Sequence, residues 1–400
     1  MKKITVKLFA ASAFILSALL LSSCGNTSAD AGKINTPSEM EPSPTVPTES
    51  AIGEDQLPET EPEVRDIAGE IIAGMSLEEK VGQLFLIRCP QTDGNATIEA
   101  YHPGGIVMFA VNFEGKTPAD SYSECMSYQD TSAIPLLIAV DEEGGTVTRI
   151  SRFTEYRSAK FKSPRELYAA GGLELILSDT VEKCNLLASC GVNVNLAPVC
   201  DISTSEDDFM YYRSLGQNAE ITSEYIASVV SVMNSKNIGC ALKHFPGYGS
   251  NGDTHTDIIT DTREYSEFLE KDFLPFKAGI EAGAGCVMVS HNIVNCIDST
   301  YPASISAKMH EILRNELGFE GVIVTDDLSM DAITLYTDGA SAAVAAVLSG
   351  NDMLCCSDYA TQYPAVLGAV QDGTISVERI EESVRRILNW KISLGLIEAE

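Results

Sequence analysis

The sequence predicts an α/β fold in which residues 64–400 form a single (β/α)8 TIM-like barrel. Eight short apolar runs recur along this part of the chain, and segments with helix-like patterning lie between them. The runs are near-continuous in Val, Ile, Leu and Met, which is typical of strands covered on both faces. Polar residues stand at or near the ends of six of the eight runs, where such barrels carry their active sites: Asp141, Asp201, Lys243 with His244, Ser290 with His291, Asp326 and Asp358. A doubly wound parallel sheet is the alternative architecture.

The eight predicted strands share this apolar character and cover residues 82–87, 105–110, 134–140, 192–198, 238–242, 285–290, 321–325 and 352–356. Helical patterning is clearest in the segments 217–235, 264–283, 305–317, 338–349 and 376–394. Before the first strand, Ser76 and Glu79 have the spacing of a capping box, which predicts that a helix begins there.

The N-terminus has the pattern of an export signal rather than of folded structure. Lys2, Lys3 and Lys7 precede an apolar stretch from residue 8 to 21 that is short for a membrane span. The segment Leu21-Ser-Ser-Cys24 resembles a bacterial lipoprotein box. We therefore expect residues 1–23 to be a signal peptide, with Cys24 lipidated and the protein anchored on the extracytoplasmic face of the cell membrane. An ordinary secretory signal is the alternative.

Residues 24–63 are expected to be a disordered tether. Six of the 16 prolines lie between Pro37 and Pro62, among Ser, Thr and Glu. Such a segment buries too little apolar area to offset its chain entropy. The formal net charge of −30 disfavours nucleic acid or an anionic membrane surface as a partner, so the lipid is the only expected membrane contact. We expect a monomer.

Cysteine usage indicates buried thiols. The chain has 11 cysteines and no Cys-x-x-Cys spacing, and Cys240, Cys286, Cys355 and Cys356 lie inside apolar runs. None of the five histidines stands near a cysteine at ligand spacing, so we expect no metal. Disulfides remain open, because an exported location permits them.

The chain is organised around the stretch from Ala241 to His255. An apolar strand ends there at Lys243 and His244, and a glycine-rich loop follows that carries Asp253 and His255. A histidine that works as a general acid must be protonated within reach of a leaving oxygen, and a carboxylate two residues away can orient its ring. A surface histidine without function is the alternative.

Asp326 follows the apolar strand 321–325 and is itself followed by Asp327. Neighbouring side chains at a strand end point in different directions, so one carboxylate can face the barrel mouth while the other packs outward. A carboxylate at this position can attack an anomeric carbon and form a covalent glycosyl intermediate. The alternative, an N-cap for the next helix, suits Asp327 better than Asp326.

Other polar residues at strand ends suit sugar binding. Asp141 precedes a double-glycine turn and can accept hydrogen bonds from hydroxyls, although a purely structural turn fits it equally well. Arg213, Lys243 and His244 supply donors that also favour ionised carboxylates nearby. For Arg213 taken alone, surface charge is the alternative.

Two other motifs are weak. Gly247, Gly249 and Gly252 match the dinucleotide fingerprint, but the sequence after them has no helical face and the fingerprint must open a helix. No Gly-x-Ser-x-Gly elbow is present, which disfavours a Ser–His–Asp hydrolase. We expect no cofactor.

Taken together, these motifs resemble family 3 glycoside hydrolases, specifically the bacterial β-N-acetylglucosaminidase branch. The resemblance runs from about Met75 to Leu396. Its carriers are Met75-Ser-Leu-Glu-Glu-Lys-Val-Gly-Gln83, Val140-Asp-Glu-Glu-Gly-Gly145, Asn195-Leu-Ala-Pro-Val199, Arg213-Ser-Leu-Gly216, Lys243-His-Phe-Pro-Gly-Tyr-Gly249 with Asp253-Thr-His255, Met288-Val-Ser-His291, and Gly321-Val-Ile-Val-Thr-Asp-Asp-Leu-Ser-Met330.

The resemblance implies a retaining mechanism without a metal. By it, Asp326 is the nucleophile, His255 the acid/base and Asp253 its partner. The residues that then contact the sugar in the −1 subsite are Asp141, Arg213, Lys243, His244 and His291. A histidine as the acid marks this branch, since other members of the family use a Glu that lies on a second domain. We expect no such second domain here.

Three departures from the family pattern put the preferred aglycone in doubt. Tyr248 stands where His is common, Thr146 stands where Arg often follows the double glycine, and the loop from Lys243 to His255 is one residue shorter than the commonest form.

The sequence therefore predicts an exported exo-hydrolase of terminal β-linked N-acetylglucosamine, with peptidoglycan fragments as substrate. Two alternatives stay open. One is a different reaction on the same scaffold, either β-glucoside hydrolysis or phosphorolysis. The other is a non-catalytic lipoprotein that binds wall glycans.

Overall fold

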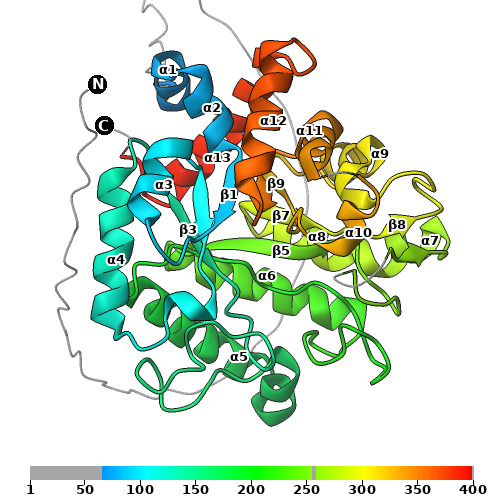
Figure 1. Ribbon diagram of the computed structural model, residues 1–400. Helices are drawn as coiled ribbons and strands as arrows, with labels where there is room; N and C mark the ends of the chain where they lie inside the picture. Colours follow the sequence, from blue (N-terminus) through cyan, green and yellow to red (C-terminus); the bar gives the residue numbers. More distant parts are fainter. Residues whose placement is uncertain (1–64, 255–257, 338, 399–400) are drawn as a thin grey trace, which may run out of the picture. The chain divides into compact units, whose positions relative to one another are not determined.

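Eight parallel strands form a nearly closed barrel in the computed structural model, which describes residues 65–254, 258–337 and 339–398 (Figure 1). These strands are β1 Phe85–Arg88, β2 Gly105–Val107, β3 Leu137–Val140, β4 Val194–Asn195, β5 Gly239–Phe245, β7 Cys286–Val289, β9 Val322–Thr325 and β10 Leu354–Cys356. They pair in the order β10-β1-β2-β3-β4-β5-β7-β9. A parallel bridge between Val324 and Met353 joins the two outer strands, β9 and β10. The predicted barrel is thus confirmed.

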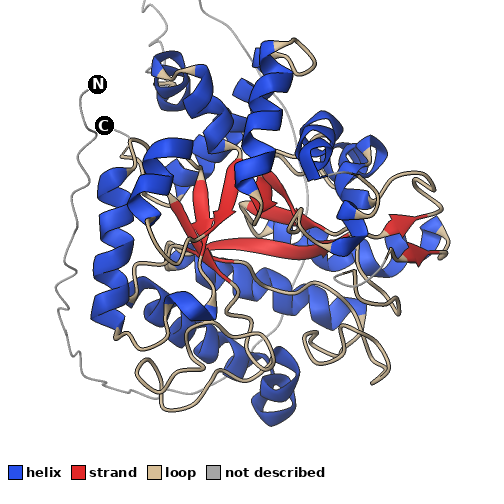
Figure 2. Ribbon diagram, in the orientation of Figure 1, coloured by secondary structure: helices blue, strands red, loops and turns tan. Residues whose placement is uncertain are grey.

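Helices surround the strands on all sides (Figure 2). They are α1 Ile67–Gly74, α2 Leu77–Gln83, α3 Gly94–Tyr101, α4 Pro118–Thr131, α5 Pro164–Ser189, α6 Ala219–Ser235, α7 Tyr265–Glu267, α8 Phe273–Glu281, α9 Ala307–Glu311, α10 Asp331–Thr334, α11 Gly339–Ser349, α12 Tyr359–Gln371 and α13 Val377–Ser393. Shorter elements are the 3-10 turns η1 Ala110–Asn112 and η3 Ala303–Ile305, the π-helices η2 Phe268–Asp272 and η4 Ile312–Glu316, and a two-stranded ladder of β6 Thr260–Asp261 and β8 Ile293–Val294.

The start of α2 agrees with the sequence pattern, and its end does not. Ser76 Oγ accepts from the Glu79 amide at 3.2 Å, and Glu79 Oε2 accepts from the Ser76 amide at 2.8 Å, which completes the predicted capping box. The helix then continues through Gly82 and Gln83, which we had placed in the first strand. Gln83 stays helical because its side chain is buried, and its Nε2 donates to the His102 carbonyl at 3.0 Å.

Helix α13 closes the bottom of the barrel, the end at which the strands begin. Ile387, Trp390 and Leu394 belong to the same apolar cluster as the inward-facing strand residues. The Trp390 ring occupies the space that side chains on Gly239 and Gly285 would need, since a Cβ on Gly285 would lie 2.2 Å from Trp390 Nε1. This packing leaves the opposite end, where the strands finish, for a functional site.

Several predictions fall outside the described residues. They are the signal peptide 1–23, the tether 24–63 with Cys24, and His255. Within the described ranges no helix is both long and apolar enough to cross a bilayer. All ten cysteines of these ranges are free thiols and eight are buried, which confirms that most are buried thiols.

Candidate active site

Four alternating charges form the centre of the site, at the ends of β3 and β5. Lys243 Nζ lies 2.8 Å from Asp141 Oδ1 and 2.7 Å from Glu143 Oε1. Arg213 grips Glu143 with two parallel contacts, Nη2 to Oε1 at 2.7 Å and Nε to Oε2 at 3.0 Å. The structure thus brings together three predicted site residues, Asp141, Arg213 and Lys243, through Glu143, which the sequence analysis had not selected.

Burial would by itself neutralise these groups, and their mutual contacts prevent it. Burial alone would raise the pKa of Glu143, yet Arg213 and Lys243 hold that pKa well below its usual range. Burial likewise opposes the charge on Lys243, yet Asp141 and Glu143 raise the pKa of this lysine above its usual value. Glu143 and Lys243 are therefore both charged at neutral pH, with donors already oriented for a polar ligand.

An irregularity in β5 explains how two consecutive residues both serve this site. Leu242 pairs with Val287 of β7, whereas Phe245 pairs with Val289, so three steps on β5 match two on β7. In a regular strand, Lys243 and His244 would point to opposite faces. The predicted strand ended at Leu242, and β5 in fact continues through both polar residues to Phe245. The peptide bond between Lys243 and His244 is cis.

The His244 ring lies between Arg213 and Asp201. Arg213 Nη2 lies 3.2 Å from His244 Nε2, and because an arginine can only donate, Nε2 must accept. The hydrogen is therefore on Nδ1, which donates to Asp201 Oδ2 at 2.8 Å. Asp201 also accepts from the backbone amides of His244 and Tyr248, at 3.0 and 2.8 Å. Asp201 thus fixes the ring orientation, and the sequence analysis noted it only as a polar strand end.

Asp326 and Asp327 make different contacts at the end of β9. Asp326 is half-buried, its amide donates to the Val289 carbonyl at 2.9 Å, and its Oδ1 accepts from the Asp327 amide at 2.9 Å. Asp327 is also half-buried and accepts from Ser329 and Ser357. Its role is to tie this turn to the end of β10. It is not the N-cap of α10, because Met330 holds that position.

Tyr248 connects the loop after β5 with the end of β9. Its buried hydroxyl lies 2.6 Å from Thr254 Oγ1, and its ring meets the His244 ring edge-on at 5.2 Å. The pKa of Tyr248 is raised chiefly by burial and next by the negative charge of Asp326. The neighbouring Asp253 is half-buried. The loop segment that precedes His255 therefore reaches the neighbourhood of Asp326.

His291 is fully buried at the end of β7. Its Nε2 lies 3.1 Å from the Asp327 carbonyl, which can only accept, and its Nδ1 lies 2.7 Å from Ser304 Oγ. These contacts support the turn that presents Asp326. Its contact with a sugar stays a prediction.

Two further cations lie at the rim, around the aromatic ring of Phe109. The guanidinium carbon of Arg88, at the exposed end of β1, is 4.4 Å from the ring centroid, and that of Arg149 is 5.4 Å away. Arg149 Nη2 also lies 3.3 Å from Asp141 Oδ2. This arginine therefore links the rim to the central network.

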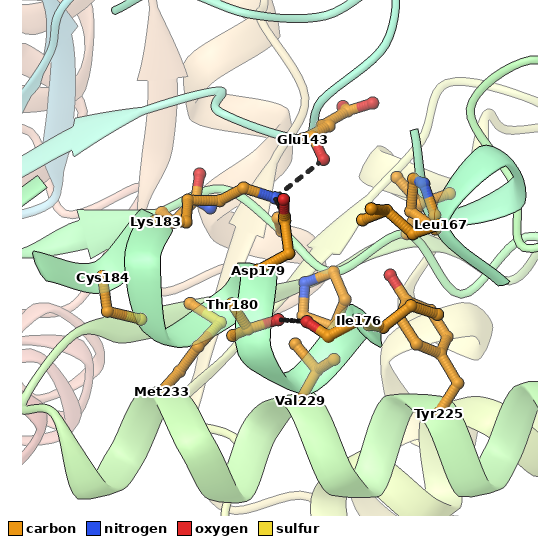
Figure 3. A pocket seen from close by; sticks show the side chains of 15 residues that line it. Glu143, Leu167, Ile176, Asp179, Thr180, Lys183, Cys184, Tyr225, Val229 and Met233 are labelled. Atoms are coloured by element: carbon orange, nitrogen blue, oxygen red, sulfur yellow. Dashed lines mark hydrogen bonds and ion pairs between the residues drawn. The ribbon is translucent and has the colours of Figure 1, made fainter. Parts of the chain in front are cut away.

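A small cavity lies on the other side of Glu143, between α5, α6 and β4 (Figure 3). Its volume of about 30 Å³ admits water but no sugar. Lys183 Nζ donates to the Glu143 carbonyl at 3.1 Å and lies 3.5 Å from Asp179 Oδ2. This side supports the backbone of Glu143 and binds no substrate.

The missed residues Glu143 and Asp201 share one signal that was available in the sequence. Both acids stand three positions after the end of a predicted strand, at residues 140 and 198, on the side where such a barrel carries its site. Within the described residues, no group of three or more His, Cys, Asp or Glu side chains could hold a metal ion.

Comparison with known proteins points to one family. The model of the glycosyl hydrolase family 3 N terminal domain matches residues 76–390. A beta-hexosaminidase of Nitrosomonas eutropha is 33% identical over 274 residues, which cover 65% of this chain and 76% of that protein. A beta-hexosaminidase of Xanthomonas campestris is 30% identical over 300 residues, 73% of this chain and 84% of that protein.

Solved structures agree in fold. The family 3 β-N-acetylglucosaminidase from Paenibacillus superposes with a TM-score of 0.75 at 30% identity, over 80% of this chain, and this chain spans 63% of its length. The β-N-acetylhexosaminidase from Beutenbergia cavernae gives a TM-score of 0.71 at 26% identity, over 79% of this chain and 98% of that one.

Proposed function

The chain belongs to glycosyl hydrolase family 3 and is a glycoside hydrolase, and from this premise we propose that it is a retaining exo-β-N-acetylglucosaminidase. The observation that carries the proposal is the ion-pair network of Asp141, Lys243, Glu143 and Arg213 at the end of the barrel where the strands finish, the end at which Asp326 follows β9. The substrate named for the similar proteins from Paenibacillus and Beutenbergia supports the choice of sugar.

The proposed reaction has two steps. Asp326 attacks the anomeric carbon, the bond from this carbon to the leaving oxygen breaks, and protonated His255 gives its proton to that oxygen. His255 then takes a proton from water, which attacks the same carbon and releases Asp326. Two inversions give net retention. Asp253 orients His255, and donors and acceptors of the network, with His244 and His291, hold the sugar hydroxyls.

Two variants test these roles. Asp326→Ala should reduce nitrophenol release from an aryl N-acetylglucosaminide by at least about ten-thousandfold, because no covalent intermediate can form. His255→Ala should slow a substrate with a poor leaving group at least about a hundredfold more than one with a good leaving group. Equal losses on both substrates would refute the acid role of His255.

Phosphorolysis or β-glucoside hydrolysis on the same scaffold is the alternative reaction. A β-glucoside phosphorylase superposes with a TM-score of 0.74, but at 23% identity this supports the fold alone. Product analysis on both aryl sugars, with and without phosphate, decides between them. Sugar 1-phosphate as the main product would replace hydrolysis in this account, and no turnover at all would favour a glycan-binding lipoprotein.

The rim supports an aglycone that carries a carboxylate, as peptidoglycan fragments do. In a chain with 57 acidic and 27 basic side chains, Arg88 and Arg149 place two guanidinium groups around Phe109 beside the network. An arginine fork recognises a carboxylate well. Wild-type kcat/KM should favour a muramic acid disaccharide over chitobiose, and Arg88→Ala should reduce that preference. If the ratio of kcat/KM for the muramic acid disaccharide to kcat/KM for chitobiose is the same in the wild type and in Arg88→Ala, this use of the rim is excluded.

The cellular location is also a proposal. We infer that Cys24 is lipidated and that the protein is anchored outside the cytoplasmic membrane, where peptidoglycan lies. The Cys24→Ala variant should leave the membrane fraction and keep its activity. If the variant and the wild type fractionate alike, the anchor is excluded.

A further inference from the structure

The two glycines after β5 have a role that sugar binding does not explain. Gly247 and Gly249 have φ angles of +114° and +58°, a region that favours glycine. A Cβ on Gly249 would lie 2.6 Å from Arg263 Cζ, and one on Gly247 would lie 2.6 Å from Asp272 Oδ1. Both glycines therefore let the loop backbone lie directly against one ion pair, Arg263 Nη1 to Asp272 Oδ2 at 2.8 Å.

Arg263 holds both described ends of the loop that carries Asp253 and His255. At the start of the loop, Arg263 Nη2 donates to the Gly247 carbonyl at 3.0 Å. At its end, Nε and Nη2 grip the buried Asp261 carboxylate, with Nη2 2.7 Å from Oδ2. Asn251 adds a bond within the loop, from Nδ2 to Asp261 Oδ2 at 2.7 Å. One side chain thus fixes the separation of the two ends.

The same guanidinium attaches the loop to the helical layer. Asp272 and Phe268 are both buried and both belong to the π-helix η2. The Arg263 guanidinium carbon lies 4.3 Å from the centroid of the Phe268 ring. Phe268 belongs to the main hydrophobic core. Because these contacts together use Nε, Nη1, Nη2 and the flat face of the guanidinium, lysine cannot replace arginine here.

We propose that Arg263 is a positioning residue for acid catalysis, because it holds in place the two described ends of the loop in whose sequence Asp253 and His255 stand. This inference rests on the proposed function. Proton donation requires hydrogen-bond distance to the leaving oxygen, and a displacement of about 1 Å can cost about a hundredfold in rate. Attack by Asp326 on a substrate with a good leaving group needs no such proton.

The test compares Arg263→Lys with the wild type on two substrates. On chitobiose, a poor leaving group, kcat should fall about ten- to a hundredfold with KM changed less than about threefold. On the dinitrophenyl N-acetylglucosaminide, kcat should stay within about threefold. On chitobiose, the decrease of kcat/KM toward high pH, which reports the loss of the proton from the general acid, should also become shallower in Arg263→Lys.

Arg314→Lys is the matched control. Arg314 also pairs with a buried aspartate, Asp352 at 2.5 Å, and also lies over a phenylalanine, Phe319 at 5.5 Å. It has no contact with the described part of the loop. This variant should lose stability yet affect both substrates equally. Equal losses on both substrates for Arg263→Lys would overturn the positioning role.

Amide hydrogen exchange separates this inference from the proposed function. In Arg263→Lys, exchange of segment 247–261 should accelerate at least about tenfold, while Arg314→Lys leaves this segment unchanged. If the wild type hydrolyses neither substrate, the proposed function fails. The exchange rates of segment 247–261 then still test whether Arg263 anchors the loop. Unchanged exchange refutes the anchoring. If Arg263→Lys does not fold, Asp272→Asn replaces it, because this variant keeps the contact between Arg263 and Asp261. It should show smaller changes of the same kind in kinetics and in exchange. If it shows neither, the inference is contradicted.

Discussion

Lys243 lies buried between two carboxylates, 2.8 Å from Asp141 and 2.7 Å from Glu143. A buried lysine with such partners holds its charge, and here it also holds two acids in fixed positions. Glu143 likewise pairs with Arg213, whose Nη2 also lies at hydrogen-bond distance from His244 Nε2. Each of these side chains holds its neighbours in position, so removal of one should displace the others.

Glu143→Gln tests this dependence. The change keeps the shape but leaves the buried Arg213 and Lys243 with too little negative charge. We expect the free energy of unfolding to fall by about 3 kcal/mol and kcat/KM by about a hundredfold or more. Urea unfolding and aryl glycoside kinetics measure the two effects.

Glu182→Gln is the control for Glu143→Gln. Glu182 pairs with Arg157 at 2.8 Å, but its side chain is 56% exposed. Solvent screens this pair, so the variant should cost less than about 1 kcal/mol and leave kinetics unchanged. Similar losses in both variants would contradict the central place of Glu143.

At the scale of elements, the sequence pattern predicted what depends on local periodicity and missed what depends on contacts across the barrel. Strands such as β3 and β7 were predictable because they are apolar over their whole length. The continuation of β5 through Lys243 and His244 was not, since it follows from its pairing with β7. Glu143 and Arg213 lie 70 positions apart, and only closure of the barrel brings them together.

Helix α13 contains a second buried lysine, which has no acidic partner among the residues that the structure describes. Lys391 Nζ donates to Gln83 Oε1 of α2 at 2.7 Å. Burial lowers the pKa of Lys391 to about 7 from the ordinary 10.5. The unfolded chain therefore binds a proton that the native state releases between pH 7 and 10.5, so this group makes the free energy of unfolding rise with pH in that window.

Lys391→Met should remove this pH dependence. Between pH 7 and 8.5 the free energy of unfolding of the wild type should rise by about 1.5 kcal/mol relative to the variant. The loss of the bond to Gln83 adds a cost that does not vary with pH. Trp390, the one tryptophan of the chain, is the neighbouring residue and reports unfolding by fluorescence.

Lys277→Met, on the exposed surface of α8, is the matched control and should leave the pH slope of the wild type unchanged. A slope for Lys391→Met equal to that of the wild type would contradict the assignment of this titration to Lys391.

At the scale of the whole molecule, the barrel has two unlike ends. Trp390 and its apolar neighbours fill the end where the strands begin. The other end gathers Arg88, Arg149, Arg213 and Lys243, although the chain as a whole carries a formal net charge of −30. The fold thus separates a stabilising end from a chemical end, as parallel barrels do. We propose that Asp326 is the carboxylate at the chemical end that reacts with the sugar.

Covalent trapping on Asp326 tests this account most directly. The enzyme would be incubated with 5-fluoro-N-acetylglucosaminyl fluoride, which forms a slowly hydrolysed glycosyl ester with a catalytic carboxylate, and its peptides would then be analysed by mass spectrometry. The account predicts one added sugar, on the peptide that contains Asp326, and none on Asp326→Ala. A label on another carboxylate, or an active enzyme whose first product has the inverted configuration, would contradict it.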